Sequence, residues 1–182
     1  MTLTYTYDTP HGMLIIAPGR AEDVATLADI GEDVMAWQRS RGIDPGHLPR
    51  PLLEIAAARV REGGIYLATL GGEPAGTVTL RDEPEELWED LPGDALYVHG
   101  LMVRRAFAGQ EIGRVMLHWT ERRAAELGLP LLRLDCDATN PALRSYYKRA
   151  GFTHRGDVVL AHRAAARYEK RVEEDANAAA PV

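Results

Sequence analysis

A glycine-containing turn between an apolar strand and a helix is the feature of this sequence best suited to hold an anion. The strand pattern covers residues 95–103, and the helix pattern begins near Glu111. Gly109 and Gly113 lie at this junction, and glycine allows a ligand to approach the backbone closely. The first N–H groups of a helix have no partner within the helix and stand at the positive end of its dipole. The turn therefore predicts an anion site suited to phosphate.

Three side chains with titratable groups are candidates for proton transfer. Leu143, Tyr147 and Ala150 share one stripe of a predicted helix, so Tyr147 faces inward. From the residues alone, the favoured interpretation is a core aromatic whose hydroxyl is satisfied by the backbone. His99 and Asp135 lie in predicted strands, and a satisfied sheet residue is at least as good an interpretation for each of them.

The length and composition are those of one globular domain. The chain has 182 residues, of which 46% are hydrophobic and 26% charged, enough for one core and short for two. The net charge of −6 argues against nucleic-acid binding, which needs a basic surface. The single cysteine, Cys136, rules out an internal disulfide and favours a cytoplasmic location. The scattered histidines predict no metal site, and the lack of a long apolar stretch predicts no membrane span.

The apolar and turn patterns predict the element order β-α-α-β-β-β-α-β-α-β-β. Strands are expected over residues 13–17, 65–70, 76–80, 95–103, 131–136, 152–160 and 166–172, and helices over residues 23–37, 52–61, 111–127 and 140–150. This order predicts a single α/β domain, of the α+β mixed-sheet kind, over residues 11–173. Residues 1–10 are expected to be loose or to form an edge, and the alanine-rich residues 174–182 to be disordered.

An acidic run with one tryptophan, Trp88, separates two of the predicted strands. Residues 82–94 contain seven acidic side chains, and such a run is most often a solvated loop. The alternative interpretation is an acidic rim that attracts an ammonium group.

Three segments of the chain resemble the GCN5-related N-acetyltransferase (GNAT) family. They are the strand-loop-helix segment 101–114, the strand Leu131–Cys136, and the segment Asn140–Phe152, which reads Asn-Pro-Ala-Leu-Arg-Ser-Tyr-Tyr-Lys-Arg-Ala-Gly-Phe. A lone glycine loop is weak evidence, but three blocks in the family's order and spacing are strong. The resemblance implies a GNAT fold with a central splayed sheet. It also implies transfer of an acetyl group from acetyl-CoA to a primary amine, without a metal.

The resemblance also implies where acetyl-CoA would lie. The pantetheine arm pairs with the backbone of Leu101, Met102 and Val103, like an added strand, and a backbone N–H near Met102 or Val103 stabilises the oxyanion. Asn140 either contacts the pantetheine or caps its own helix. The pyrophosphate meets the backbone of the loop and helix start, at Ala108, Gly109, Gln110, Glu111, Ile112, Gly113 and Arg114.

In the family's motif, a tyrosine at the position of Tyr147 protonates the leaving thiolate, with Tyr146 as the second choice here. A phenol of pKa ~10 that protonates a thiolate of pKa ~8.5 works uphill by about 2 kcal/mol. Asp135 or His99 could take the proton of the attacking amine, directly or through water. Asp135 stands where ribosomal-protein acetyltransferases of the family carry a glutamate, and burial there would raise its pKa. His99 lies two residues before Leu101, on the same face of the predicted strand.

The loop departs from the family pattern Gln/Arg-x-x-Gly-x-Gly/Ala. Ala108 stands at the basic or amide position, and Glu111 stands at the first glycine. A carboxylate about 4 Å from a phosphate costs roughly 1 to 4 kcal/mol, which predicts weaker CoA binding. If Glu111 points to solvent, it interacts favourably with the helix dipole instead. Arg104, Arg105 and Arg114 are close enough in sequence to offset part of its charge.

Three hypotheses follow for the function. The first is an acetyl-CoA-dependent N-acetyltransferase, and the second is a catalytically weak or idle CoA-binding or regulatory domain, suggested by Glu111. The third is transfer of a different acyl group, or transfer to an aminoacyl acceptor. The acceptor walls expected from the family, residues 37–51 and 157–163, carry both acids and bases. Charge therefore leaves small-molecule and peptide amines open. Edge strands at the two ends of the chain make a homodimer conceivable.

Overall fold

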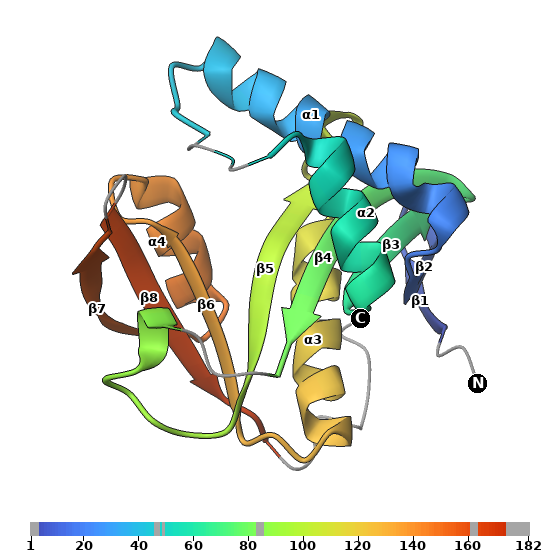
Figure 1. The fold of residues 1–182 in the computed structure, drawn as a ribbon. Coiled ribbons are helices and arrows are strands. Elements are labelled where there is room, and N and C mark those ends of the chain that lie inside the picture. The colour runs from blue at the N-terminus through green and yellow to red at the C-terminus, as the bar shows by residue number, and fades with distance from the viewer. Residues whose placement is uncertain (1–3, 46–47, 49, 83–85, 161–163, 174–182) are drawn as a thin grey trace. The chain divides into compact units, whose positions relative to one another are not determined.

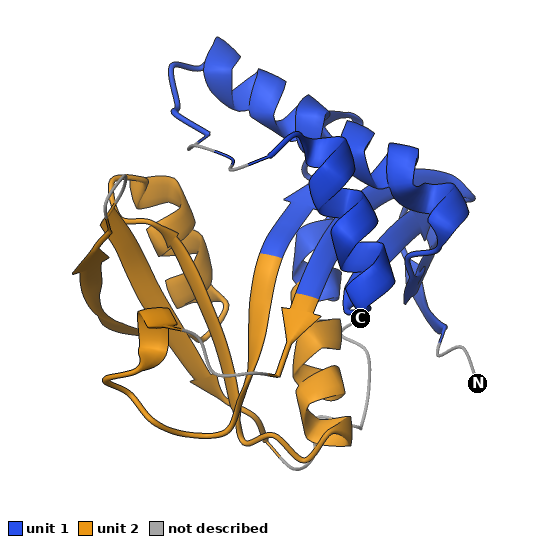
Figure 2. Ribbon diagram, in the orientation of Figure 1, with its two compact units in different colours: residues 1–79, 100–116, 180–182 blue, residues 80–99, 117–179 orange. Residues whose placement is uncertain are grey.

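The structure, a computed structural model, describes residues 4–45, 48, 50–82, 86–160 and 164–173. They form two compact units (Figure 2). Of the described residues, those within 1–79 and 100–116 belong to unit 1, and those within 80–99 and 117–179 belong to unit 2. Both the predicted tail, 174–182, and residues 83–85 of the acidic run lie outside the described residues. Within the described ranges, no helix combines the length and apolar character needed to cross a bilayer.

The element order confirms the predicted single-domain α/β fold with a mixed sheet and adds one strand at the N-terminal end (Figure 1). The strands are β1 (Tyr5–Thr9), β2 (Gly12–Pro18), β3 (Ile65–Leu70), β4 (Glu73–Arg81), β5 (Ala95–Val103), β6 (Leu131–Asp137), β7 (Thr153–Val159) and β8 (Ala164–Arg171). The helices are α1 (Val24–Ser40), α2 (Leu52–Glu62), α3 (Ile112–Glu126) and α4 (Pro141–Arg149), with short 3-10 turns η1 (Ala21–Asp23), η2 (Glu86–Trp88) and η3 (Arg105–Phe107). The strand order is β1-β2-β3-β4-β5-β6-β8-β7.

Unit 1 contains an antiparallel run of strands with two helices packed on it. Strands β1 to β4 each pair with their neighbours in the sequence. Residues 1–10 were expected to be loose or to form an edge, and β1 is an edge strand of the sheet. Leu27 of α1, Ala56 of α2 and Ile65 of β3 share one core cluster. Gly31 lets α1 approach α2 closely, since a Cβ there would lie 2.9 Å from Leu52.

Unit 2 contains the parallel pair of the sheet and helix α4. The first half of β5 runs parallel to β6, and β8 pairs antiparallel with both β6 and β7. Helix α4 begins as the sequence predicts, with Asn140 as its N-cap and Pro141 in the first turn, where proline removes no helix hydrogen bond. Gly151 follows the helix with a φ of 87°, which suits a left-handed C-terminal cap.

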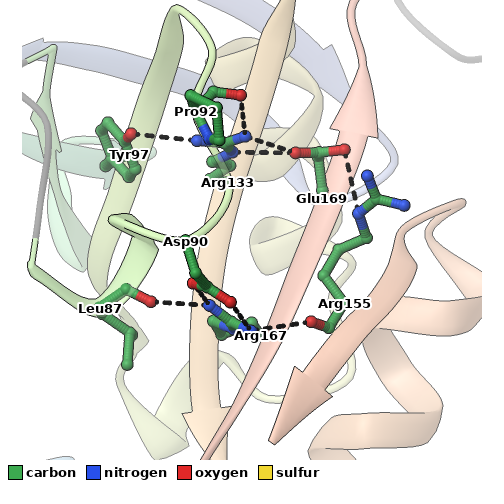
Figure 3. A network of polar contacts seen from close by, with 8 residues as sticks. All are labelled: Leu87, Asp90, Pro92, Tyr97, Arg133, Arg155, Arg167 and Glu169. Carbon is green, nitrogen blue, oxygen red and sulfur yellow. Dashed lines mark hydrogen bonds and ion pairs between the residues drawn. The ribbon is translucent and has the colours of Figure 1, made fainter. Parts of the chain in front are cut away.

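The acidic side chains of the run are exposed where the structure describes them, as expected of a solvated loop, but residues 86–94 are also anchored to the sheet. Trp88 is buried against Ala95 and Tyr97, and buried Arg167 of β8 donates to the Leu87 carbonyl and the Asp90 carboxylate (Figure 3). The physical reason is that a buried guanidinium requires acceptors, and this segment supplies them. A pattern of acidic residues does not reveal such a partner on a distant strand.

Figure 3 also shows a second buried arginine that holds the same segment. Arg133 of β6 is 2% exposed and lies 2.8 Å from a Glu169 carboxylate oxygen. It also donates to the Tyr97 hydroxyl at 3.3 Å and to the Pro92 carbonyl at 3.5 Å. Its guanidinium lies 4.8 Å from the centre of the Trp88 ring. The acidic run is therefore attached to β6 and β8 by charge and aromatic contacts.

Candidate active site

Strands β5 and β6 stop pairing partway along their length, within unit 2. The parallel ladder ends with the pair Val98–Leu134, beyond which β6 continues with β8 as its partner. His99 and Asp135 are the first residues after that last rung, one on each strand, and both are half-buried. The predicted splay of the sheet requires that β5 and β6 stop pairing partway along their length. The two candidate bases thus stand at the same level of the two strands.

Gly100 interrupts β5 immediately after His99. Its φ of 53° lies in the left-handed region, which breaks the alternation of side chains along a strand. The predicted shared face of His99 and Leu101 depended on unbroken alternation and loses its geometrical basis. Space also favours glycine here, because a Cβ would lie 3.2 Å from an Arg59 guanidinium nitrogen.

The residues from Leu101 to Arg114 that are predicted to bind acetyl-CoA all belong to unit 1. The end of β5 lies against β4, where the Arg104 N–H donates to the Ala75 carbonyl at 2.8 Å. The backbones are close, since a Cβ on Gly76 would lie 2.7 Å from the Met102 carbonyl oxygen. The strand then enters η3 and the loop that precedes α3.

Glu111 has a left-handed backbone conformation. Its φ is 61°, and no other non-glycine among the described residues has a positive φ. Its carbonyl accepts the N–H groups of Arg114 and Val115, at 2.9 and 3.0 Å, so it stands at the start of α3. The family pattern has glycine at this position, and left-handed backbone is the conformation that glycine adopts without steric cost.

The three arginines expected to offset Glu111 have different environments. Arg114 Nε donates to the Glu111 carboxylate at 2.5 Å, with both side chains about half exposed. Arg105 places its guanidinium 4.0 Å from the centre of the Trp37 ring. Arg104 has a buried Nε with no hydrogen-bond partner within the described parts of the chain. The charge of Glu111 is therefore compensated by one neighbour, and Arg104 retains a donor for another group.

Asn140 acts as a helix cap. Its side-chain Oδ1 accepts the Leu143 N–H at 3.1 Å, which is the capping role foreseen as one of two alternatives. This bond uses the carbonyl oxygen, so the amide N–H groups remain as the donors with which Asn140 could contact a pantetheine.

Tyr147 faces the interior of unit 2, as its helical stripe predicts. The residue is 8% exposed, and its ring lies 5.8 Å from that of Tyr168, 6.0 Å from Phe152 and 5.3 Å from Tyr146. Burial raises the pKa of the Tyr147 phenol, and the nearby Cys136 adds to the shift. At neutral pH the side chain is therefore uncharged.

Sequence reasoning missed the contacts between α1 and η3. Asp33 accepts the backbone N–H of Arg105, and Trp37 lies beneath the Arg105 guanidinium. The two α1 residues are four apart and share a stripe, a spacing visible in the sequence. Nothing in the pattern connects that stripe to a residue 72 positions later. Among the residues that the structure describes, no group of three His, Cys, Asp or Glu side chains is arranged to hold a metal ion.

Comparisons with known proteins agree with this fold. The sequence matches the profile of the Acetyltransferase (GNAT) family over residues 31–152. It is 30% identical over 146 residues to the "Uncharacterized N-acetyltransferase YesJ" of Bacillus subtilis, a match that covers 76% of this chain and 81% of that protein. The chain therefore belongs to the GNAT acetyltransferase family, and its enzyme class is that of the acetyl-CoA-dependent acyltransferases.

Two solved structures illustrate the similarity of the fold. A GNAT-family acetyltransferase from Listeria monocytogenes has a TM-score of 0.77 and 25% identity, with 92% of this chain and 99% of that chain covered. RimL, a ribosomal L7/L12 alpha-N-protein acetyltransferase solved in complex with coenzyme A, has a TM-score of 0.65 and 19% identity, with 89% and 96% covered.

Proposed function

We propose that this chain transfers the acetyl group of acetyl-CoA to a primary amine by direct attack on the thioester, with Tyr147 as the general acid. In this reaction the amine nitrogen bonds to the thioester carbonyl carbon, and the carbon–sulfur bond breaks. The leaving thiolate takes the Tyr147 proton, and the amine proton passes to a base. The products are an amide and coenzyme A.

The backbone at Glu111 is the observation that carries this proposal. A non-glycine residue in left-handed conformation costs about 1 to 2 kcal/mol, so the surrounding structure must hold it there. The loop thus has the backbone that the family's glycine would give, although the glycine is replaced. The N–H groups of Gln110 and Arg114 already donate to the Phe107 and Glu111 carbonyls. The first N–H groups of α3, at Ile112 and Gly113, have no carbonyl four residues back within the helix and would be the donors to a diphosphate. The pantetheine would then run along Leu101 to Val103.

The surroundings of Tyr147 support its role as the acid. The raised pKa makes the Tyr147 phenol a weaker acid than a free tyrosine, so the support for this role is geometric: the aromatic neighbours limit the directions that its ring can take. With an ordinary phenol of pKa ~10, proton transfer to a thiolate of pKa ~8.5 costs about 2 kcal/mol, and the raised pKa of Tyr147 increases this cost. Tyr146, its half-buried neighbour, is the matched position for comparison.

His99 and Asp135 are both retained as candidates for the base. They occupy corresponding positions on β5 and β6, just past the last rung of the ladder. A base on either strand could act through one water, since an alkylamine is mostly protonated at neutral pH and must lose its proton before it attacks. The variants His99→Gln and Asp135→Asn distinguish the two candidates. The pH profile of kcat should shift to more alkaline pH in the variant that lacks the base.

The decisive experiment is thiol release from acetyl-CoA with a panel of acceptors. The panel contains a polyamine, a lysine-containing peptide with a blocked N-terminus and a peptide with a free N-terminus, because similar folds include enzymes named as protein N-terminal acetyltransferases. We expect amine-dependent thiol release, and a fall of about 10²-fold or more in kcat for Tyr147→Phe with little change in KM for acetyl-CoA. Tyr146→Phe is the control and should retain its kcat.

The second candidate function is a CoA-binding or regulatory domain with little catalysis. The observation in its favour is that the Glu111 carboxylate already pairs with Arg114, a cation at the start of α3. Coenzyme A binding without amine-dependent thiol release across the panel would select this function. Equal kcat in Tyr147→Phe and wild type would remove Tyr147 from the mechanism.

A further inference from the structure

Helix α1 is joined to turn η3 by two contacts that meet at one residue. The backbone N–H of Arg105 donates to an Asp33 carboxylate oxygen at 2.9 Å. The guanidinium of the same Arg105 lies 4.0 Å from the centre of the Trp37 ring. Asp33 and Trp37 are one helical turn apart on α1, and all three residues belong to unit 1 (Figure 2).

Asp33 satisfies a backbone group that the turn itself leaves open. The first N–H of a helical turn has no partner within the turn, and here the acceptor comes from a residue 72 positions earlier. The following backbone bonds, from Phe107 N–H to the Arg104 carbonyl and from Ala108 N–H to the Arg105 carbonyl, continue the turn into the loop. Asp33 therefore holds the backbone of the turn that leads into residues 108–114.

Trp37 holds the side chain of Arg105 in the same place. An arginine stacked on an indole is attracted electrostatically by the ring and packs against its face. Arg105 is thus committed to α1 at both its backbone and its side chain, unlike Arg104, whose buried Nε has no hydrogen-bond partner within the described residues.

We propose that Asp33 and Trp37 are positioning residues for the diphosphate of coenzyme A, which they never touch. By holding Arg105, they set the shape of the loop that receives the diphosphate, so the affinity for coenzyme A depends on α1. This inference rests on the proposed function, since it takes residues 108–114 as the diphosphate site.

Whether removal of Asp33 raises or lowers the affinity for coenzyme A distinguishes a positioning role from a purely electrostatic one. Asp33 carries a negative charge, so its removal should strengthen the binding of a polyanion if charge alone matters. If Asp33 shapes the loop, its removal should weaken that binding. Asp29, exposed one turn earlier on α1, supplies the matched control because Asp29→Ala changes the net charge by the same amount.

The test is calorimetric titration of coenzyme A and of inorganic pyrophosphate into wild type, Asp33→Ala, Asp33→Asn, Trp37→Leu and Asp29→Ala. We expect Asp33→Ala to bind both ligands about tenfold more weakly, as for the loss of one charge-assisted hydrogen bond. Asp33→Asn keeps an oxygen acceptor and should restore most of the affinity. Trp37→Leu should weaken binding to a smaller extent, and Asp29→Ala should bind as tightly as wild type or slightly more tightly. Unfolding midpoints of all variants are measured alongside.

The outcomes separate this inference from the proposed function. If wild type binds coenzyme A and Asp33→Ala binds it equally or more tightly, the positioning role is wrong and the proposed function stands. Weakening in Asp33→Asn as large as in Asp33→Ala also overturns the role, because the acceptor is then not what matters. Absence of coenzyme A binding to wild type overturns both.

Discussion

Arginine–carboxylate pairs occur in two regions of this protein under opposite conditions. In unit 2, Arg133 and Arg167 are 2% and 5% exposed, and each has several acceptors around it. In unit 1, the Arg114 side chain is 48% exposed, and it pairs with the similarly exposed Glu111. The chemical groups are the same in both regions, but the surrounding dielectric is different.

This difference indicates which region serves the fold and which is free to serve a ligand. A buried guanidinium must keep its partners, because an unpaired buried charge costs several kcal/mol. A surface pair contributes about 0 to 1 kcal/mol, so it can exchange its carboxylate for a ligand phosphate at little cost. The buried arginines attach residues 86–97 to the sheet, whereas Arg114 remains available at the start of α3.

The largest expected effect comes from removing a partner of a buried arginine. Glu169→Ala leaves Arg133 without its carboxylate, and we expect a loss of about 3 to 5 kcal/mol of unfolding free energy. Chemical denaturation followed by tryptophan fluorescence measures it, since Trp88 lies 4.8 Å from the Arg133 guanidinium. Glu169→Gln, which keeps an acceptor oxygen, should lose less.

A double substitution checks the cause of that loss. Arg133→Met combined with Glu169→Met removes both charges together, and we expect it to be more stable than Glu169→Ala alone. If the double variant is the less stable of the two, the loss in Glu169→Ala comes from packing and not from an uncompensated charge.

The contrast between the two regions also explains what the sequence could predict. Strands and helices that repeat an apolar pattern were found within a few residues, as for β3 at residues 65–70 and α2 at residues 52–62. The inward face of Tyr147 and the cap at Asn140 follow from spacing within one helix and were equally accessible. Both depend on neighbours in the chain.

Contacts between residues far apart in the chain were not predictable in this way. The anchoring of the acidic run could not be predicted, because Arg167 lies on a strand 77 residues beyond Asp90. The break in β5 at Gly100 and the left-handed backbone at Glu111 are conformations imposed by the fold, and single-sequence patterns do not report φ. The assignment of Tyr147, Asp135 and His99 to catalysis stays a prediction for the kinetic experiments above.

A smaller effect, of opposite sign, is expected at the exposed pair. Glu111→Gly removes about 1 to 2 kcal/mol of left-handed strain and loses a surface pair of a few tenths of a kcal/mol. Part of the gain is offset by the greater freedom of glycine in the unfolded chain. We expect a net stabilisation of about 0.5 to 1 kcal/mol and severalfold tighter coenzyme A binding, because Arg114 is released.

Glu111→Gln is the matched control for this variant, because it removes the charge and keeps the strained backbone. It should bind coenzyme A more tightly than wild type without gaining stability. Unchanged or weaker affinity in Glu111→Gly, measured by calorimetry, means that the carboxylate does not oppose the diphosphate and that the exposed pair has no part in binding.

The smallest effect concerns an intermediate case, an exposed carboxylate bound to a buried arginine. The hydrogen bond from Arg167 lowers the pKa of Asp90 below its ordinary value. A carboxyl whose pKa is lower in the folded protein adds stability above its unfolded pKa of ~3.9, and that stability is lost as the pH falls through the folded pKa. The unfolding midpoint of Asp90→Asn should therefore lie slightly below that of wild type at pH 7, with the gap closing below about pH 4. If the difference in unfolding midpoint between wild type and Asp90→Asn is the same at pH 3 as at pH 7, Asp90 acts through its shape alone. The charge of this exposed carboxylate would then not contribute to its pairing with the buried Arg167.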